Sequence, residues 1–395
     1  MPEKFVYADN AATTRVSQSV LDAMLPYFGE EYGNPSSLHS KGREASAALG
    51  DARARIAKLL GAKESEIYFT ASGSEADNWA IKGAAYANRD RGKHIVSTKI
   101  EHHAVLYSLK ALEREGFEVT LVDVDQGGRV SPEAVANAVR EDTVLVSVMT
   151  ANNEVGTIEP IAEISAAVKQ KNLKTLIFTD AVQAAGTLRL DVRELGVDML
   201  SLSGHKLHPP KGVGALYIRN GIRVSNLIDG GGQERSRRGG TENLPYIIGL
   251  AKALEDAGAG IDENARVSAM RDRLIDGILD KIPYTRLNGA REQRLPGNVN
   301  ISFDYIEGES LLLWLDMNGI CASTGSACSS ASLEASHVLL ALGVPVESAH
   351  GSLRLSLGRD NTDDDVDYIL QVLPGIVERL RNMSPLYEKV NGSKI

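Results

Sequence analysis

Lys206 is the residue whose surroundings most suggest chemistry. It ends the stretch Ser203-Gly-His-Lys206, directly after an apolar run at 199–203 that predicts a buried β-strand. A lysine held in a tight turn at a strand end can lose its solvation, which lowers its pKa and permits Schiff-base chemistry. A solvated loop lysine is the commoner alternative. Ser203 and His205 could both donate hydrogen bonds to a phosphate, however, and this favours a binding site.

A carboxylate, Asp180, follows another strand-like run at 175–179. Open α/β sheets bind ligands beyond the carboxyl ends of their strands. Asp180 could therefore pair with the protonated ring nitrogen of a pyridoxal cofactor, and Gln183 would be within reach of the same ring. A helix N-cap is an equally good interpretation of Asp180 taken alone.

Gly73 and Ser74 lie where a strand-like run at 66–70 turns into a helical pattern. Backbone N–H groups at a helix start have no partner within the helix, so such a turn can bind an anion. A monophosphate suits it, because the turn lacks both the G-x-G-x-x-G spacing of dinucleotide sites and the Gly-Lys-Ser/Thr ending of a P-loop. Thr241, in the small-residue turn 239–243, could also donate to a phosphate.

His102 follows the strand-like run at 94–98. A histidine at a strand end can act as a general acid or base, or lie against a flat cofactor. A core histidine and a metal ligand are the alternatives. We expect no metal, because no pair among His102, His103, His205 and His208 has the i, i+4 spacing of a helical zinc site.

Two further residues suit substrate chemistry. Cys328 lies among glycine, serine and alanine residues in the stretch 323–332, so we expect an exposed loop and an accessible nucleophilic thiol. Cys321 follows an apolar helical pattern and is expected to be a buried small hydrophobe. Arg354, on the alternating strand 352–357, could bind an amino-acid carboxylate through two hydrogen bonds, although a surface salt bridge is an equal alternative.

Strand-like and helix-like segments alternate through the middle of the chain, a pattern typical of a mostly parallel sheet covered by helices. The rhythm changes near residue 258, where a long helical pattern and an alternating strand replace it. We therefore predict an α/β fold with a large domain at 15–258. A smaller α+β domain at 1–14 and 259–395 would carry the cysteine loop, about 321–336.

The composition of the chain argues against several classes of protein. The 395 residues include 43 Lys and Arg against 52 Asp and Glu, a formal net charge of −9, which disfavours nucleic-acid binding. Two cysteines cannot build a disulfide framework, so a reducing compartment is expected. The start has no signal-peptide pattern, and no apolar run approaches the ~20 residues that span a bilayer. We expect a cytoplasmic protein without a membrane partner.

Taken together, these segments resemble the cysteine desulfurases of the NifS/IscS-like type within the class-V aminotransferase family. The matching stretches run in order along nearly the whole chain: Tyr7-Ala-Asp-Asn-Ala-Ala-Thr-Thr14, Gly33-Asn-Pro-Ser-Ser37, Gly73-Ser-Glu-Ala-Asp-Asn78, Glu101-His102, Asn152-Asn-Glu-Val-Gly156, Asp180-Ala-Val-Gln183, Ser203-Gly-His-Lys206, Gly240-Thr-Glu-Asn243, Gly325-Ser-Ala-Cys-Ser329 and Arg354-Leu-Ser-Leu-Gly-Arg359. The resemblance implies fold-type I of the pyridoxal-phosphate enzymes, with a seven-stranded type of sheet, and a homodimer with its sites at the subunit interface.

The resemblance also implies a set of cofactor contacts. Lys206 would form the Schiff base with pyridoxal 5'-phosphate, Asp180 would hold the pyridinium proton, and Gln183 would contact the ring hydroxyl. His102 would stack on the ring and move protons, and Asn153 would also contact the cofactor. The phosphate would be bound by Gly73, Ser74, Ser203 and His205, joined by Thr241 from the second subunit.

For the substrate, the resemblance implies that L-cysteine is held through its carboxylate by Asn34 and Arg354. Cys328 would attack the substrate sulfur and keep it as a persulfide, with release of alanine. An acceptor protein such as an iron–sulfur scaffold would then receive the sulfur. Three departures from the family pattern, Pro209, Ala331 and Ala335, remove no chemical group.

Two alternatives stay open at this point. Another class-V reaction, such as transamination or selenocysteine cleavage, would use the same cofactor, but a transaminase does not need Cys328. A non-catalytic sulfur-trafficking or scaffold-interaction protein would not need Lys206, Asp180 and His102.

Overall fold

The computed structural model describes residues 4–260, 263–324 and 334–392. Its centre is a seven-stranded sheet in the order β2-β8-β7-β6-β5-β3-β4. The strands are β2 (Ile67–Thr70), β3 (His94–Thr98), β4 (Glu118–Val122), β5 (Thr143–Ser147), β6 (Leu176–Asp180), β7 (Met199–Ser203) and β8 (Gly214–Ile218). Only β8 runs antiparallel to its neighbours, and the other pairs are parallel. The predicted mostly parallel sheet is confirmed.

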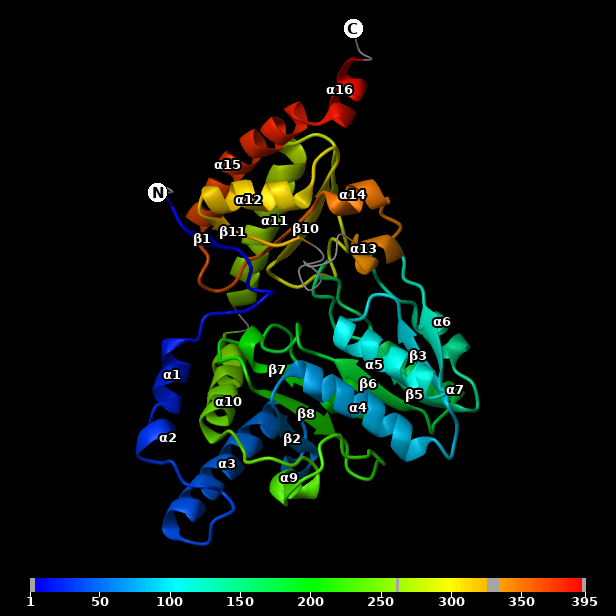
Figure 1. The fold of residues 1–395 in the computed structure, drawn as a ribbon, viewed down its shortest axis with the longest axis vertical. Helices are drawn as coiled ribbons and strands as arrows, with labels where there is room; N and C mark the ends of the chain where they lie inside the picture. Colours follow the sequence, from blue (N-terminus) through cyan, green and yellow to red (C-terminus); the bar gives the residue numbers. More distant parts are fainter. Residues whose placement is uncertain (1–3, 261–262, 325–333, 393–395) are drawn as a thin grey trace.

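Helices cover both faces of this sheet (Figure 1). One face packs against α1 (Gln18–Met24), α3 (Ser40–Leu59), α6 (Pro132–Ala138), α7 (Ile161–Lys171) and α10 (Leu244–Ala259), and the other against α4 (Gly73–Asn88) and α5 (His103–Arg114). Strands buried on both faces are apolar along their length, which explains why the sequence shows continuous runs there. Ser131 caps the start of α6, since its hydroxyl accepts a hydrogen bond from the Ala134 N–H.

A second unit is built on an antiparallel sheet, in the order β12-β10-β9. Its elements are β9 (Thr285–Leu287), β10 (Asn298–Phe303), β12 (Ser352–Ser356), α11 (Asn264–Lys281), α12 (Gly308–Met317) and α15 (Asp363–Asn382). The chain start joins this unit, because β1 (Val6–Tyr7) pairs in parallel with β11 (Ile320–Cys321). Val6 and Ala8 belong to its apolar core. The domain boundaries at 15 and 258 remain predictions, and Cys321 is half-buried rather than buried.

Short elements connect these parts. They are α2 (Pro26–Gly29), η1 (Glu64–Glu66), α8 (Val192–Leu195), η2 (Gly204–Lys206), α9 (Gln233–Ser236), α13 (His337–Ala341), α14 (Val346–His350) and α16 (Pro385–Gly392). Within the described ranges, no helix has both the length and the apolar character needed to cross a membrane.

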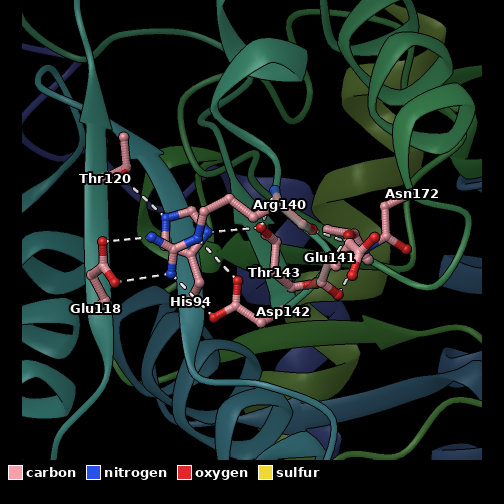
Figure 2. Close-up of polar contacts among 9 residues, drawn as sticks. His94, Glu118, Thr120, Arg140, Glu141, Asp142, Thr143 and Asn172 are labelled. Carbon is pink, nitrogen blue, oxygen red and sulfur yellow. Dashed lines mark hydrogen bonds and ion pairs between the residues drawn. The ribbon is translucent and has the colours of Figure 1, made fainter.

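The amino-terminal parts of β3, β4 and β5, at one side of the sheet, carry a polar network (Figure 2). The buried His94 ring lies 2.7 Å from the Thr143 hydroxyl and 2.9 Å from that of Thr120, one contact for each ring nitrogen. Beside it, the Arg140 guanidinium donates to Glu118 at 2.6 and 2.9 Å. This network ties three strands together at the edge opposite the strand ends that bind ligands in such sheets.

We expect His94→Leu to lower the free energy of unfolding by about 1–3 kcal/mol, because the buried Thr143 hydroxyl and the half-buried Thr120 hydroxyl each lose a hydrogen bond to the ring. Denaturant unfolding checks this. Activity measured well below the melting temperature should stay unchanged, since the site lies at the other edge of the sheet. A loss of activity as large as that of a catalytic variant would contradict a purely structural role.

The effect should depend on pH. Burial and the charge of Arg140 lower the pKa of His94. Below the ordinary histidine pKa of about 6.5, the unfolded chain therefore binds a proton that the folded chain does not. The contribution of His94 is fully present above that pH and is lost as the pH falls, so the destabilisation by His94→Leu should be larger at pH 7.5 than at pH 5.5.

Candidate cofactor and substrate site

Asp180 is the last residue of β6, in the middle of the sheet. Its carboxylate is buried and accepts a 2.8 Å hydrogen bond from the Val182 N–H. Burial raises the pKa of Asp180 to about 6, although this hydrogen bond and the Lys206 charge lower it. A buried carboxylate of this kind gains by pairing with a positively charged group, such as a protonated ring nitrogen.

Lys206 ends η2, directly after β7, the strand next to β6. Its Nζ donates to the carbonyl oxygens of Ala11 and Ala12 at 2.6 and 2.8 Å. The Gln183 amide also donates to the Ala11 oxygen, at 3.1 Å. The amine is therefore held by the N-terminal segment, which the sequence pattern alone did not indicate.

A cavity of about 220 Å³ opens beside this amine. Lys206 and Gln183 line it from the large sheet, and Asn298 and Ser356 line it from the second unit. The two units thus leave space for a small molecule next to the lysine.

His102 caps the start of α5, where its Nδ1 accepts a hydrogen bond from the Ala104 N–H at 3.1 Å. Burial, followed by the charges of Lys206 and His103, lowers the pKa of His102 to about 4. The imidazole is therefore neutral at pH 7, and because Nδ1 accepts, Nε2 carries the hydrogen.

Asp77 is a site residue that our sequence reasoning missed. One ligand-type atom each from Asp77, His102 and Asp180 lies within 4.8 Å of the other two. Asp77 is buried on α4, accepts a 2.6 Å hydrogen bond from the Ser201 hydroxyl, and has a pKa raised well above its ordinary value by burial and by Asp180. The sequence contains one signal for this residue, because Asp77 belongs to the stretch 73–78, which begins a helix and matches the family.

Gly73 brings the start of α4 against the end of β7. A Cβ added at Gly73 would lie 3.0 Å from the Ser203 Cβ and 2.8 Å from the Val182 Cγ2, so only glycine allows this approach. The first helical bond of α4 runs from the Ala76 N–H to the Ser72 oxygen. The N–H groups of Gly73 and Ser74 precede that bond and lie beside Ser203, which is a suitable donor set for an anion.

His205 and Arg354 extend the site on two sides. The His205 Nδ1 lies 3.2 Å from the Thr13 hydroxyl, and burial together with Lys206 lowers the pKa of His205 to about 4. Arg354 is buried on β12 and donates to the Asp9 carboxylate at 3.0 Å and to the Asn153 backbone oxygen at 3.1 Å. Its Nε has no hydrogen-bond partner among the described residues.

Two predicted residues are exposed, and a third lies outside the described part of the chain. Asn34 is exposed in the segment between α2 and α3, at the lower end of Figure 1, where its Oδ1 accepts from the Ser36 N–H at 2.9 Å. Thr241 is exposed in the loop between α9 and α10. Cys328 lies outside the described residues.

Comparison with known proteins places this geometry in a family. The class-V aminotransferase family matches residues 6–369, nearly the whole chain. The chain belongs to this family. The predicted resemblance is thereby confirmed.

Individual class-V relatives are similar over almost their full length. The chain is 58% identical over 387 residues to "Cysteine desulfurase IscS" of Methanosarcina thermophila, covering 98% of this chain and 95% of the relative. It is 56% identical over 388 residues to the protein of the same name from Clostridium botulinum strain Hall, covering 98% and 97%.

Solved structures of the family share the fold. One titled "NIFS-LIKE PROTEIN" superposes with a TM-score of 0.90 at 42% identity, covering 95% of this chain and all of that one. Another, titled "SspA in complex with cysteine", gives a TM-score of 0.79 at 35% identity, covering 89% and 98%. The predicted fold-type I architecture is confirmed.

The site residues of this class-V chain fit pyridoxal phosphate. The cradle at Gly73 and Ser203 offers hydrogen-bond donors, which suit a phosphate. Asp180 offers a buried carboxylate for the ring nitrogen, and Lys206 offers an amine from the neighbouring strand end. The phosphate would thus meet hydrogen-bond donors, and the ring nitrogen would meet a carboxylate.

Proposed function

We propose that this protein is a cysteine desulfurase, a pyridoxal-phosphate-dependent enzyme that removes sulfur from L-cysteine and releases L-alanine. The observation that carries the proposal is the placement of Lys206 and Asp180 on adjacent strand ends, in a chain 58% identical to a protein named cysteine desulfurase. The neighbour solved in complex with cysteine supports the choice of substrate.

Bound in this site, pyridoxal phosphate would supply an electron-withdrawing ring that stabilises negative charge at the substrate α-carbon. Lys206 would hold the cofactor covalently. Asp180 would keep the ring nitrogen protonated, since its buried carboxylate is stabilised by that positive charge. Gln183 would contact the ring hydroxyl, and Asn153 would contact the cofactor.

His102 would lie against the ring and move protons. Its low pKa leaves it neutral at pH 7, with Nδ1 accepting from the Ala104 N–H and Nε2 carrying the hydrogen that it would donate in the site. The phosphate would be bound by the helix start at Gly73 and Ser74, together with Ser203 and His205.

Arg354 would bind the substrate carboxylate. Its buried guanidinium has an Nε without a partner among the described residues, and each Nη carries a second hydrogen besides the one bonded to Asn153 or Asp9. We expect Arg354→Lys to raise the KM for L-cysteine by about 10- to 100-fold, because the bidentate geometry is lost while the charge stays. Steady-state kinetics check this, and an unchanged KM would remove Arg354 from the substrate site.

Cys328 would take the sulfur. Its thiolate would attack the substrate sulfur, so that an S–S bond forms as the C–S bond breaks and its electron pair stays with the carbon skeleton that becomes alanine. The described residues before and after the stretch that contains Cys328 contact residues of the site. The backbone of Ser323 pairs with that of Arg354, and the Ser336 hydroxyl donates to Glu154, beside Asn153.

A homodimer is part of the proposal. Thr241 is exposed in the loop between α9 and α10, and in a dimer it would serve the phosphate site of the neighbouring subunit. An acceptor protein such as an iron–sulfur scaffold would receive the persulfide sulfur, because Cys328 must pass it on for turnover. We also propose a cytoplasmic location.

The deciding experiment follows alanine and sulfide from L-cysteine and dithiothreitol with the cofactor-loaded protein. Equal amounts of the two products are expected. Pyruvate formation from alanine with an added keto acid, without sulfide, would indicate a transaminase instead. A much higher rate with selenocysteine than with cysteine would indicate a selenocysteine-cleaving enzyme, and a protein that takes up no cofactor would indicate a non-catalytic role.

A further inference from the structure

Glu75 places a negative charge at the turn that would bind the phosphate. It lies in the first turn of α4, one residue after Ser74. Its N–H donates to the Ser72 hydroxyl at 3.1 Å, and its carboxylate accepts from the Ala71 N–H at 2.9 Å. The carboxylate therefore stabilises the helix start, as acidic groups at this position do. It would also repel a phosphate bound at the same turn.

Arg238 is positioned to cancel this charge. Its Nε donates to the Glu75 Oε1 at 2.8 Å and its Nη2 to the Oε2 at 3.1 Å, a bidentate ion pair between side chains that are 18% and 14% exposed. A pair this far from solvent is screened less than a surface pair. Glu234 and Glu242 add further negative charge near Arg238. Without the guanidinium, the phosphate would lie close to the unpaired carboxylate of Glu75.

The backbone that presents Arg238 is strained. Three successive residues, Glu234, Arg235 and Ser236, have φ values of 47°, 59° and 61°. Left-handed backbone is unfavourable at a residue with a side chain, and runs of it are rare. Such a segment persists only where its surroundings hold it.

Buried polar contacts hold this segment. The Glu234 carboxylate accepts from both Nη atoms of Arg53 at 2.8 Å and from the Phe69 N–H at 3.0 Å. Phe69 is in β2, the strand that leads into the phosphate turn. The strained segment is thus attached to the same strand that carries the turn, and Arg238 follows it by two residues.

We infer that Arg238 is a positioning residue for the cofactor phosphate: it neutralises and orients Glu75, so that the start of α4 can both keep its acidic cap and accept an anion. The inference rests on the proposed function, because it takes the ligand of this turn to be the phosphate of pyridoxal phosphate.

The test compares two ligands that differ only in the phosphate, pyridoxal phosphate and pyridoxal. Dissociation constants are measured from cofactor absorbance for the wild type, Arg238→Gln, Glu75→Gln and the double variant. We expect Arg238→Gln to weaken pyridoxal phosphate binding about tenfold or more and pyridoxal binding less than about twofold. Glu75→Gln keeps a capping side chain without the charge. In the double variant it should restore phosphate-ester affinity to within about threefold of the wild type.

A matched control comes from Arg55, which makes a similar bidentate pair with Glu255 at 2.5 Å between α3 and α10. Arg55→Gln should leave both dissociation constants unchanged. If Arg238→Gln does not fold, Arg238→Lys and Glu75→Gln keep the test open. Arg238→Lys keeps the positive charge, so it should weaken pyridoxal phosphate binding less than about tenfold. Glu75→Gln should bind pyridoxal phosphate at least as tightly as the wild type.

Equal weakening for both ligands, unchanged binding in Arg238→Gln, or no restoration by Glu75→Gln would each overturn the inference. The proposed function would survive these outcomes, because the wild type would still bind the cofactor. A wild-type protein that binds pyridoxal phosphate no better than pyridoxal would overturn the inference and the proposed function together.

Discussion

Lys206→Ala should abolish the release of alanine and sulfide from L-cysteine, lowering kcat by ~1,000-fold or more. The reason is that Lys206 supplies the reacting amine: its Nζ is held at 2.6 and 2.8 Å by the carbonyls of Ala11 and Ala12, beside Gln183. The variant should also fail to retain the cofactor covalently after borohydride reduction, which mass spectrometry of the intact protein measures.

Lys211→Ala is the matched control. Lys211 is exposed and follows Lys206 closely in the sequence, so its removal changes the local charge without removing the reacting amine. Activity and covalent retention should match those of the wild type. Covalent retention in Lys206→Ala equal to that of the wild type would place the reactive amine elsewhere and refute the proposed site.

Cys328→Ala should abolish the protein-bound persulfide and lower sulfide release by ~100-fold or more, because the nucleophile that takes the substrate sulfur is lost. Cofactor absorbance should remain, since no cofactor contact is proposed for this residue. Alkylation of the persulfide followed by mass spectrometry measures the first effect, and absorbance measures the second.

Cys321→Ala provides the control within the same chain. Cys321 is half-buried in β11, and burial raises the pKa of its thiol, so it is a poor nucleophile at neutral pH. Its replacement should leave the persulfide signal intact. A persulfide that persists in Cys328→Ala and disappears in Cys321→Ala would reassign the sulfur acceptor.

Local patterns in the chain were sufficient for the strands that carry the site. The apolar runs at 175–179 and 199–203 became β6 and β7, and the positions of Asp180 and Lys206 at their ends followed directly. Adjacent parallel strands end at the same edge of a sheet, so residue order alone indicated where a ligand would bind. The long helical pattern after residue 258 likewise became α11.

Other features depended on contacts between distant parts of the chain. The carbonyls of Ala11 and Ala12 meet Lys206 because the pairing of β1 with β11 and the backbone contacts of Asn10 with Ser356 and of Thr14 with His205 hold the N-terminal segment there. A local pattern cannot encode which remote backbone atom a side chain will reach.

The charged residues of the site also depend on contacts between distant parts of the chain. The types of Asp77, Glu75 and Arg238 are visible in the sequence, but their burial and their partners are not. Asp77 became a buried neighbour of Asp180, and Glu75 gained a guanidinium from a strained turn 163 positions later. Secondary structure follows from short-range sterics and periodic burial, whereas the electrostatics of a site follow from long-range packing, which only the folded chain establishes.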